Sequence, residues 1–297
     1  MRRGADDCKG IAGDLELRGI EMAKVVVITG LADGMGREVA KLLAARGDSV
    51  AGFDVDAQGI AALTEELAKI GGDHLLEALD ITDRPGIRAF RDRVLDKYGR
   101  VDIVLSNVGN GFFGPFEEID LDFALKNLEM NVIGAAAIFQ AFIPSMRARG
   151  QGRLIAMSSL VGRIPFPFES IYTASKFALA GMVQALHYEV EPFGLRVAMI
   201  EPAQVSTSFA AKIHKLPPEG SPYRDRVRRF IDRDNELIKT APDPFTAAGM
   251  IVKVLDRGKP PMYNQFALRD SFFLFINRIL PRKVRDSILV NFMDIKC

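Results

Sequence analysis

The chain of 297 residues carries 39 lysines and arginines against 38 aspartates and glutamates, so its formal net charge is +1. This balance excludes a strongly basic nucleic-acid-binding protein, which needs a clear cationic excess, and it excludes a chain with an acidic interaction tail. Hydrophobic residues make up 48% and charged residues 26%, which is typical of a globular protein and argues against disorder.

The chain opens with a segment that shows no periodicity. Residues 1–22 are small and polar, which predicts a flexible leader, and a start at Met22 is an alternative. No apolar stretch of signal-peptide length follows Met1, and apolar runs such as 272–276 fall far short of the ~20 residues of a membrane-spanning helix. Cys8 and Cys297 have neither metal-ligand spacing nor a disulfide framework, which favours a reducing compartment. We therefore expect a cytoplasmic protein.

Apolar runs and helical patterns alternate from Lys24 onward. The runs are rich in β-branched residues, as in strands buried on both faces. The predicted strands are 25–29, 49–54, 75–79, 101–106, 153–158 and 195–200. The predicted helices are 36–46, 57–70, 85–98, 121–149, with a late kink at Pro144, and 170–193. This order predicts the α/β class, namely a single-domain Rossmann-type, doubly wound parallel sheet with helices on both faces.

The pattern loosens after Pro202. Residues 207–240 are polar and contain a cluster of arginines between 224 and 233. Because this insertion follows a strand, it lies where open α/β sheets bind ligands, and we expect a substrate lid over a solvated surface helix. A helix at 246–255 follows. We divide the chain into the leader, one α/β domain over 23–268, and an apolar and basic tail over 269–297 that is helical at 272–280 and 284–292.

A glycine-rich turn separates the first strand from the first helix. It reads Thr29-Gly30-Leu31-Ala32-Asp33-Gly34-Met35-Gly36. Gly30 allows a tight turn, Gly34 lets the backbone approach a phosphate, and Gly36 lets the helix pack on the strand. The helix N-terminus offers free N–H groups and its positive dipole end to a pyrophosphate. The segment 30–36 therefore predicts a dinucleotide site, although glycines also serve plain turns.

Asp54 ends the second strand, 54 − 34 = 20 residues beyond Gly34. A carboxylate there accepts hydrogen bonds from the adenosine ribose, whereas beside a 2′-phosphate two unit charges at ~4 Å repel by about 4 kcal/mol at a dielectric near 20. Asp33 adds a second acid, and no arginine or lysine follows Asp54 directly. These residues favour NAD over NADP, while the alternative for Asp54 is a turn acid at a strand end.

Tyr172 and Lys176 are four residues apart and share one face of a predicted helix. A lysine ammonium beside a phenol favours the phenolate, so we expect the pKa of Tyr172 to fall toward working pH. Ser159 lies thirteen residues before Tyr172, at a strand end, and its hydroxyl can hold a substrate oxygen. Together with the glycine turn, the three residues indicate a catalytic site, although a YxxxK pair alone is weak evidence for one.

These motifs together resemble the short-chain dehydrogenase/reductase family in its compact TGxxxGxG form, over about residues 24–265. The resemblance implies that Ser159, Tyr172 and Lys176 are catalytic and that Asn131 holds a proton-relay water. It also implies cofactor contacts beyond the glycine turn and Asp54. These are Asp80 with Ile81 at the adenine, Asn107, Val108 and Gly109 beside the cofactor, Tyr172 and Lys176, and the segment Pro202–Thr207 with Val205, in which Thr207 lies near the nicotinamide. Val108 stands where the family has alanine, and Ala203 stands where it has glycine. Both changes affect the fine geometry close to the cofactor.

The resemblance implies an NAD(H)-dependent oxidoreductase that interconverts a secondary alcohol and a ketone. The segment 260–263 and the long tail are similar to the branch acting on steroids and retinoids, so we expect a bulky, lipophilic substrate. The alternatives are a 3-oxoacyl-type ketoreductase and a catalytically idle NAD-binding sensor or scaffold. The presence of Ser159, Tyr172 and Lys176 argues against a catalytically idle protein. A sugar epimerase would need TGxxGxxG and a larger substrate domain.

Several expectations concern partners. The histidines are scattered, so no metal is predicted. Phe166 and Phe168 either shape an apolar substrate pocket or pack internally.

The family resemblance implies a homodimer or homotetramer through helices 121–149 and 170–193. The tail either packs as an ordinary helix, covers the cleft, seals a dimer edge, or touches an anionic membrane surface.

Overall fold

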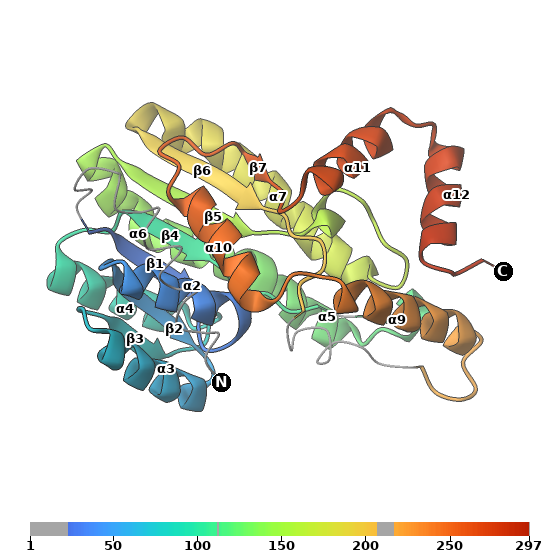
Figure 1. Cartoon of the computed structure of the whole chain (residues 1–297), viewed down its shortest axis with the longest axis horizontal. Coiled ribbons are helices and arrows are strands. Elements are labelled where there is room, and N and C mark those ends of the chain that lie inside the picture. The colour runs from blue at the N-terminus through green and yellow to red at the C-terminus, as the bar shows by residue number, and fades with distance from the viewer. Residues whose placement is uncertain (1–22, 112, 207–216, 297) are drawn as a thin grey trace, which may run out of the picture.

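The computed structural model describes residues 23–111, 113–206 and 217–296. Its centre is a seven-stranded parallel sheet in the order β3-β2-β1-β4-β5-β6-β7 (Figure 1). The strands are β1 (Val25–Thr29), β2 (Ser49–Asp54), β3 (Leu75–Ala78), β4 (Ile103–Ser106), β5 (Gly152–Met157), β6 (Leu195–Ile200) and β7 (Tyr263–Asn264). The predicted fold class is confirmed. β7 was not predicted, because two residues carry no periodic signal.

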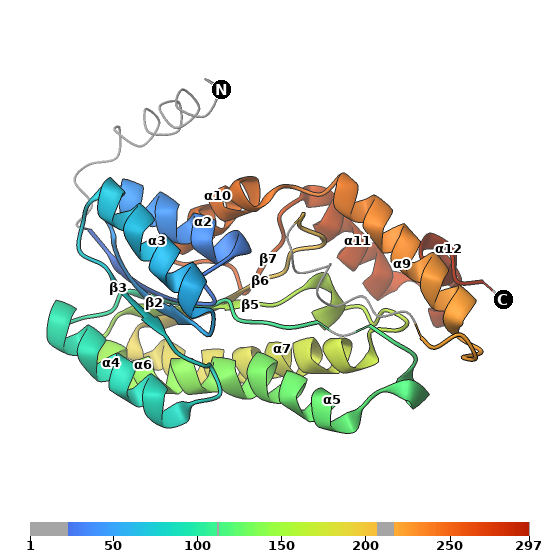
Figure 2. The ribbon, with the colours of Figure 1, turned by 90° about the horizontal axis from the view of Figure 1, so that it is seen from below.

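Helices cover both faces of the sheet (Figure 2). On one face lie α2 (Gly34–Ala45), α3 (Ala57–Ile70) and α10 (Pro244–Leu255), and on the other lie α4 (Arg84–Tyr98), α6 (Ala135–Arg149) and α7 (Ser170–Val190). Several of these helices begin after an aspartate whose carboxylate accepts a first-turn N–H. Asp33 does so for α2, Asp56 for α3, Asp83 for α4 and Asp243 for α10. The Asp33 cap explains why α2 begins at Gly34, two residues before its predicted start.

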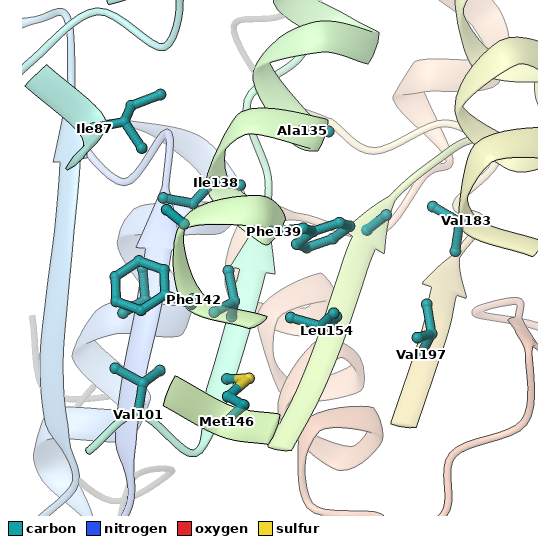
Figure 3. Packing of buried hydrophobic residues seen from close by; sticks show 14 of the residues in the cluster. Ile87, Val101, Ala135, Ile138, Phe139, Phe142, Met146, Leu154, Val183 and Val197 are labelled. Carbon is teal, nitrogen blue, oxygen red and sulfur yellow. The ribbon is translucent and has the colours of Figure 1, made fainter. Parts of the chain in front are cut away.

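The core forms two apolar layers, one on each face of the sheet. Successive β1 residues point to opposite faces, so Val25 and Val27 enter one layer and Val26 and Ile28 enter the other. This arrangement is why the strand sequences are continuously apolar. Figure 3 shows Phe139 and Phe142 of α6 directed at the sheet, and both side chains are fully buried or nearly so.

The helix predicted over 121–149 is interrupted. It consists of α5 (Leu121–Leu128), a π-helical turn η2 (Glu129–Gly134) and α6. We predicted a departure from regular helix at Pro144, but the change of helix type lies at η2, which contains Asn131. By length and composition, Leu121–Arg149 is the one helical segment in the described ranges that could cross a membrane. Here its apolar α6 side chains cover the sheet.

Three further helices lie beyond the carboxyl ends of the strands (Figures 1 and 2). They are α9 (Arg224–Lys239), α11 (Leu268–Ile279) and α12 (Arg282–Phe292). Short helical turns occur at η1 (Phe116–Glu118), η3 (Leu160–Gly162) and η4 (Glu191–Phe193). Residues 207–216 of the predicted lid lie outside the described residues, so the lid is represented by α9 and its flanks.

Three arginines of the basic cluster join α9 to the end of the tail. Arg233 Nε donates to the Phe292 carbonyl at 2.9 Å, and Arg229 donates to the carbonyls of Asp294 and Lys296, both at 2.9 Å. Arg226 Nε donates to the Ile295 carbonyl at 3.3 Å. The Phe292 carbonyl ends α12, and carbonyls at a helix C-terminus lack intrahelical partners and carry partial negative charge that cations stabilise. These arginines therefore act structurally, attaching the segment after α12 to α9.

Candidate active site

A cleft of about 530 Å³ opens at the carboxyl edge of the sheet. Parallel strands bring the loops that follow them to one edge, so residues distant in sequence meet there. The predicted residues that line it are Gly30, Asp33, Gly34, Met35, Asp54, Asp80, Ile81, Asn107, Val108, Gly109, Ser159, Tyr172, Lys176, Pro202 and Val205. Gly36 and Asn131 lie behind this lining, as described below, and Thr207 lies outside the described residues.

Backbone geometry at the glycine turn explains two of its glycines. Gly30 has φ of 72°, a conformation that favours glycine. A Cβ on Gly36 would lie 2.1 Å from the Gly30 carbonyl oxygen, so only glycine lets α2 approach β1 this closely. Asn107 Nδ2 donates to the same oxygen at 2.8 Å. As a result the first turn of α2, with Gly34 and Met35, opens on the cleft and presents a helix N-terminus to it.

The Asp54 carboxylate is held at one end of the cleft. Its oxygens accept hydrogen bonds from the backbone N–H of Ala32 at 3.1 Å and of Asp56 at 3.0 Å. Asp33 lines the same end. Arg37 is the nearby cation, but it donates to the Ala32 carbonyl at 2.9 Å and pairs with Glu66 at 3.0 Å. Within the described part of the chain, Lys176 is the sole basic residue that lines the cleft.

Ser159, Tyr172 and Lys176 meet at the inner part of the cleft and are all buried. The Tyr172 hydroxyl is hydrogen-bonded to Ser159, which stands at the N-cap of η3. One turn along α7, Lys176 Nζ lies 5.7 Å from the centroid of the Tyr172 ring and donates to the Met157 carbonyl at 2.9 Å. The structure therefore brings the three predicted catalytic side chains together.

Burial controls the charge state of these groups. It raises the pKa of Tyr172, the neighbouring Glu169 carboxylate raises it further, and the Ser159 hydrogen bond lowers it in part. Burial also lowers the pKa of Lys176 to about 8. The expectation that Lys176 brings the pKa of Tyr172 below its usual value is therefore wrong for this structure, because burial and the Glu169 carboxylate together outweigh the Ser159 hydrogen bond.

Asn131 lies behind the cleft in a network of amides. Its Oδ1 accepts from Asn110 N at 2.8 Å, and its Nδ2 donates to the Asn110 carbonyl at 2.8 Å and to Ser175 Oγ at 2.9 Å. Gly109 separates this network from Lys176, since a Cβ there would lie 3.3 Å from Lys176 Nζ and 3.7 Å from Asn131 Oδ1. The π-helical turn thus fixes the Asn110 backbone at the wall of the cleft. Sequence reasoning missed Asn110, which has no spacing signal of its own.

Further residues that sequence reasoning missed also line the cleft. Besides Asn110 they are Val55, Leu79, Met130, Met157, Ser158 and Ala203. Ala203 belongs to the predicted cofactor segment Pro202–Thr207, and the others adjoin predicted residues or strand ends without a signal of their own.

Glu169 is the most consequential group that sequence reasoning missed. It is buried just before α7, and burial together with the nearby Asp234 of α9 raises its pKa well above the usual range. Asp234 is also buried and accepts from Gln204 Nε2 at 3.2 Å. No local signal marked Glu169, because it stands just before the first residue of both the predicted helix and α7.

The predicted aromatic residues pack in a cluster rather than into the described cleft. Phe230 of α9 contacts Phe113 and Phe168 edge-on, at centroid distances of 5.5 and 5.8 Å. Phe166 joins the same cluster. Phe168 has φ of 61°, uncommon for an aromatic residue, and its carbonyl accepts from Gly114 N at 2.8 Å. The cluster fastens α9 over the loop that precedes Tyr172.

The chain matches known proteins over most of its length. The family model for short chain dehydrogenases matches residues 24–217. 17-beta-hydroxysteroid dehydrogenase type 1 of Homo sapiens is 32% identical over 252 residues, covering 80% of this chain and 76% of the relative. Estradiol 17-beta-dehydrogenase 1 of Rattus norvegicus is 36% identical over 269 residues, covering 86% and 75%. A solved short-chain dehydrogenase from Streptomyces avermitilis is 30% identical, with a TM-score of 0.74 and coverage of 92% and 96%.

Proposed function

Because the chain belongs to the short-chain dehydrogenase/reductase family, whose members are oxidoreductases that bind a nicotinamide cofactor, we propose that it interconverts a secondary alcohol and a ketone with NAD. The substrate we propose is bulky and lipophilic. One observation carries the proposal: the buried side chains of Tyr172, Ser159 and Lys176 lie together in the cleft that the glycine turn also lines.

The residues of the cleft fit a dinucleotide. The α2 N-terminus suits a pyrophosphate, Asp54 suits ribose hydroxyls, and the smallness of Gly109 leaves Lys176 accessible from the cleft. When bound, a nicotinamide supplies the acceptor or donor for the hydrogen and electron pair at the alcohol carbon. Asp33 and Asp54, with Arg37 already paired to Glu66, support NAD over NADP.

The protein side chains handle the proton and the orientation of substrate. We assign Tyr172 as the group that takes the alcohol proton during oxidation and returns it during reduction. Ser159 holds the reacting oxygen and, through its hydrogen bond, favours the phenolate of Tyr172. Lys176 contributes positive charge beside Tyr172 and orients the cofactor ribose. Asn131 holds the Asn110 backbone and supports the path by which the proton returns to solvent.

The proposed substrate class rests on the relatives. The two steroid-dehydrogenase relatives carry a hydroxysteroid or estradiol in their names. The 3-oxoacyl ketoreductase and the idle NAD-binding protein are the alternatives.

A panel of alcohols and ketones tests the proposal. With NAD or NADH, followed by nicotinamide absorbance, we expect turnover of steroid-like or other polycyclic secondary alcohols to exceed that of short alcohols. Faster turnover of 3-oxoacyl thioesters would favour the ketoreductase. Cofactor binding without turnover of any compound would favour the idle protein and contradict our proposal.

Exposed apolar side chains support the proposed homo-oligomer. Leu121 and Leu125 of α5, Ile133 of η2 and Phe177 of α7 are exposed although large and hydrophobic. A Cβ on Gly181 would touch nothing within 4 Å, so this helix surface is open to a neighbour. We propose that these helices form the subunit interface of a cytoplasmic protein.

Glu169 predicts a shift in the pH profile. Above its own raised pKa, Glu169 is charged and disfavours the Tyr172 phenolate, so Glu169→Gln is expected to lower the pKa of Tyr172. Alcohol oxidation needs the phenolate, and its rate rises with pH through this pKa. We therefore expect the rising limb of kcat/KM to move to lower pH in the variant. The exposed Glu65→Gln serves as the charge control, and an unmoved limb in Glu169→Gln would show that this carboxyl does not act on Tyr172.

A further inference from the structure

The outer face of α11 carries an apolar strip. Leu268, Phe272, Phe275 and Ile279 are 91%, 65%, 59% and 59% exposed. Their spacing of four, three and four residues places them on one side of the helix. Soluble monomers rarely expose contiguous apolar patches larger than a few hundred Å². A strip of this kind therefore indicates a surface that is covered by something outside the described chain.

The next helix extends the apolar surface. Val284, Ile288 and Phe292 of α12 are partly exposed. α12 turns back toward α11, with the rings of Phe273 and Phe292 6.5 Å apart, and the pair stands at the end of the molecule beyond the strands (Figure 1). A groove between the two helices is lined in part by residues 163–165, from the loop that follows Ser159. The groove is lined by other α11 residues than the strip, which leaves the strip on the outer side of the helix pair.

Basic side chains border the strip. Residues 268–292 contain five arginines and lysines and two aspartates, a balance of 5 − 2 = +3, although the whole chain is only +1. At the α-helical angle of about 100° per residue, Arg269 and Arg278 lie about 90° to either side of the strip. The Arg269 and Arg282 side chains are 77% and 86% exposed. Apolar residues flanked by exposed arginines are typical of helices that lie in a membrane interface.

We infer that the α11–α12 surface docks on an anionic lipid bilayer. The aromatic and aliphatic side chains would enter the boundary between headgroups and acyl chains, while the arginines meet anionic headgroups. A second copy of the chain fits less well, because a two-fold contact through this strip would bring the same arginines of both copies together. The inference does not depend on which alcohol is oxidised.

Co-sedimentation of the full chain with lipid vesicles tests the inference. We expect binding to phosphatidylcholine vesicles that contain phosphatidylserine, and at least about tenfold weaker binding to phosphatidylcholine alone. Phe272→Ser/Phe275→Ser should reduce binding to the anionic vesicles at least about tenfold, and Arg269→Gln/Arg278→Gln should remove most of the preference for them. All these side chains are exposed, so both variants should keep the thermal unfolding midpoint and the turnover of a water-soluble alcohol.

The matched control is Phe116→Ser/Phe193→Ser, which removes two exposed phenylalanines outside the tail. It should bind anionic vesicles as the parent does. Equal loss in this control, or no vesicle binding by the parent, would overturn the inference. It would also fail if Phe272→Ser/Phe275→Ser lowered the oligomeric state in light scattering, since a second copy would then be the occupant. Because vesicle binding needs no cofactor or substrate, its failure is distinguishable from failure of the proposed activity.

Discussion

Tyr172→Phe is expected to reduce turnover by about 10²–10⁴-fold in both directions while leaving NADH binding intact. The substitution removes the hydroxyl that is hydrogen-bonded to Ser159 and that we assign to proton transfer. It keeps the buried ring beside Lys176, so the shape of the cleft should persist. Steady-state kinetics measure the first effect, and titration calorimetry with NADH measures the second.

Tyr188→Phe is the matched control, because Tyr188 stands on the same helix with 76% of its surface exposed. Its turnover should equal that of the parent. Undiminished turnover of any substrate by Tyr172→Phe would rule out the assigned role. Loss of NADH binding in the same variant would instead mean that the ring supports the cofactor site.

The second large effect concerns cofactor choice. We expect the unmodified protein to prefer NAD over NADP by at least about tenfold in kcat/KM, which corresponds to ~1.4 kcal/mol. This needs only part of the repulsion of about 4 kcal/mol between two charges at ~4 Å. Asp54→Ser should narrow the preference, and Asp54→Arg should invert it, because the new guanidinium would attract a 2′-phosphate. Kinetics with both cofactors at one ionic strength measure the ratio.

Asp96→Asn, an exposed position on α4, controls for the change in net charge and should leave the ratio unchanged. Equal use of NAD and NADP by the unmodified protein would contradict the assignment of Asp54. So would a ratio that Asp54→Arg leaves as it was. If the protein used both cofactors equally, Arg37 would have to leave Glu66 to bind the 2′-phosphate. Glu66→Gln would then raise kcat/KM with NADP.

The order of strands and helices follows from local sequence. β1, β2, α3 and β6 have the bounds that their apolar periodicity predicts, because burial on both faces demands continuous apolar strands and one-sided packing demands helical spacing. The glycine turn is equally local, since strand, turn and helix adjoin in the chain. Tyr172 and Lys176 are local in the same sense, because a separation of four residues places two side chains on one face of any α-helix.

Contacts between segments far apart in the chain could not be predicted from local sequence patterns. The π-helical turn at Asn131 is accompanied by hydrogen bonds to Asn110, 21 residues away. Arg233 meets the Phe292 carbonyl 59 residues along the chain, and Glu169 meets Asp234 only because α9 packs over the loop before α7. No repeat or spacing in the sequence records which carbonyl an arginine will reach or which carboxyl another will face. Local sequence thus determined the order of the sheet strands and the glycine turn. The charge states around Tyr172 and the attachment of the tail were decided by the tertiary structure, because they depend on burial and on contacts between distant residues.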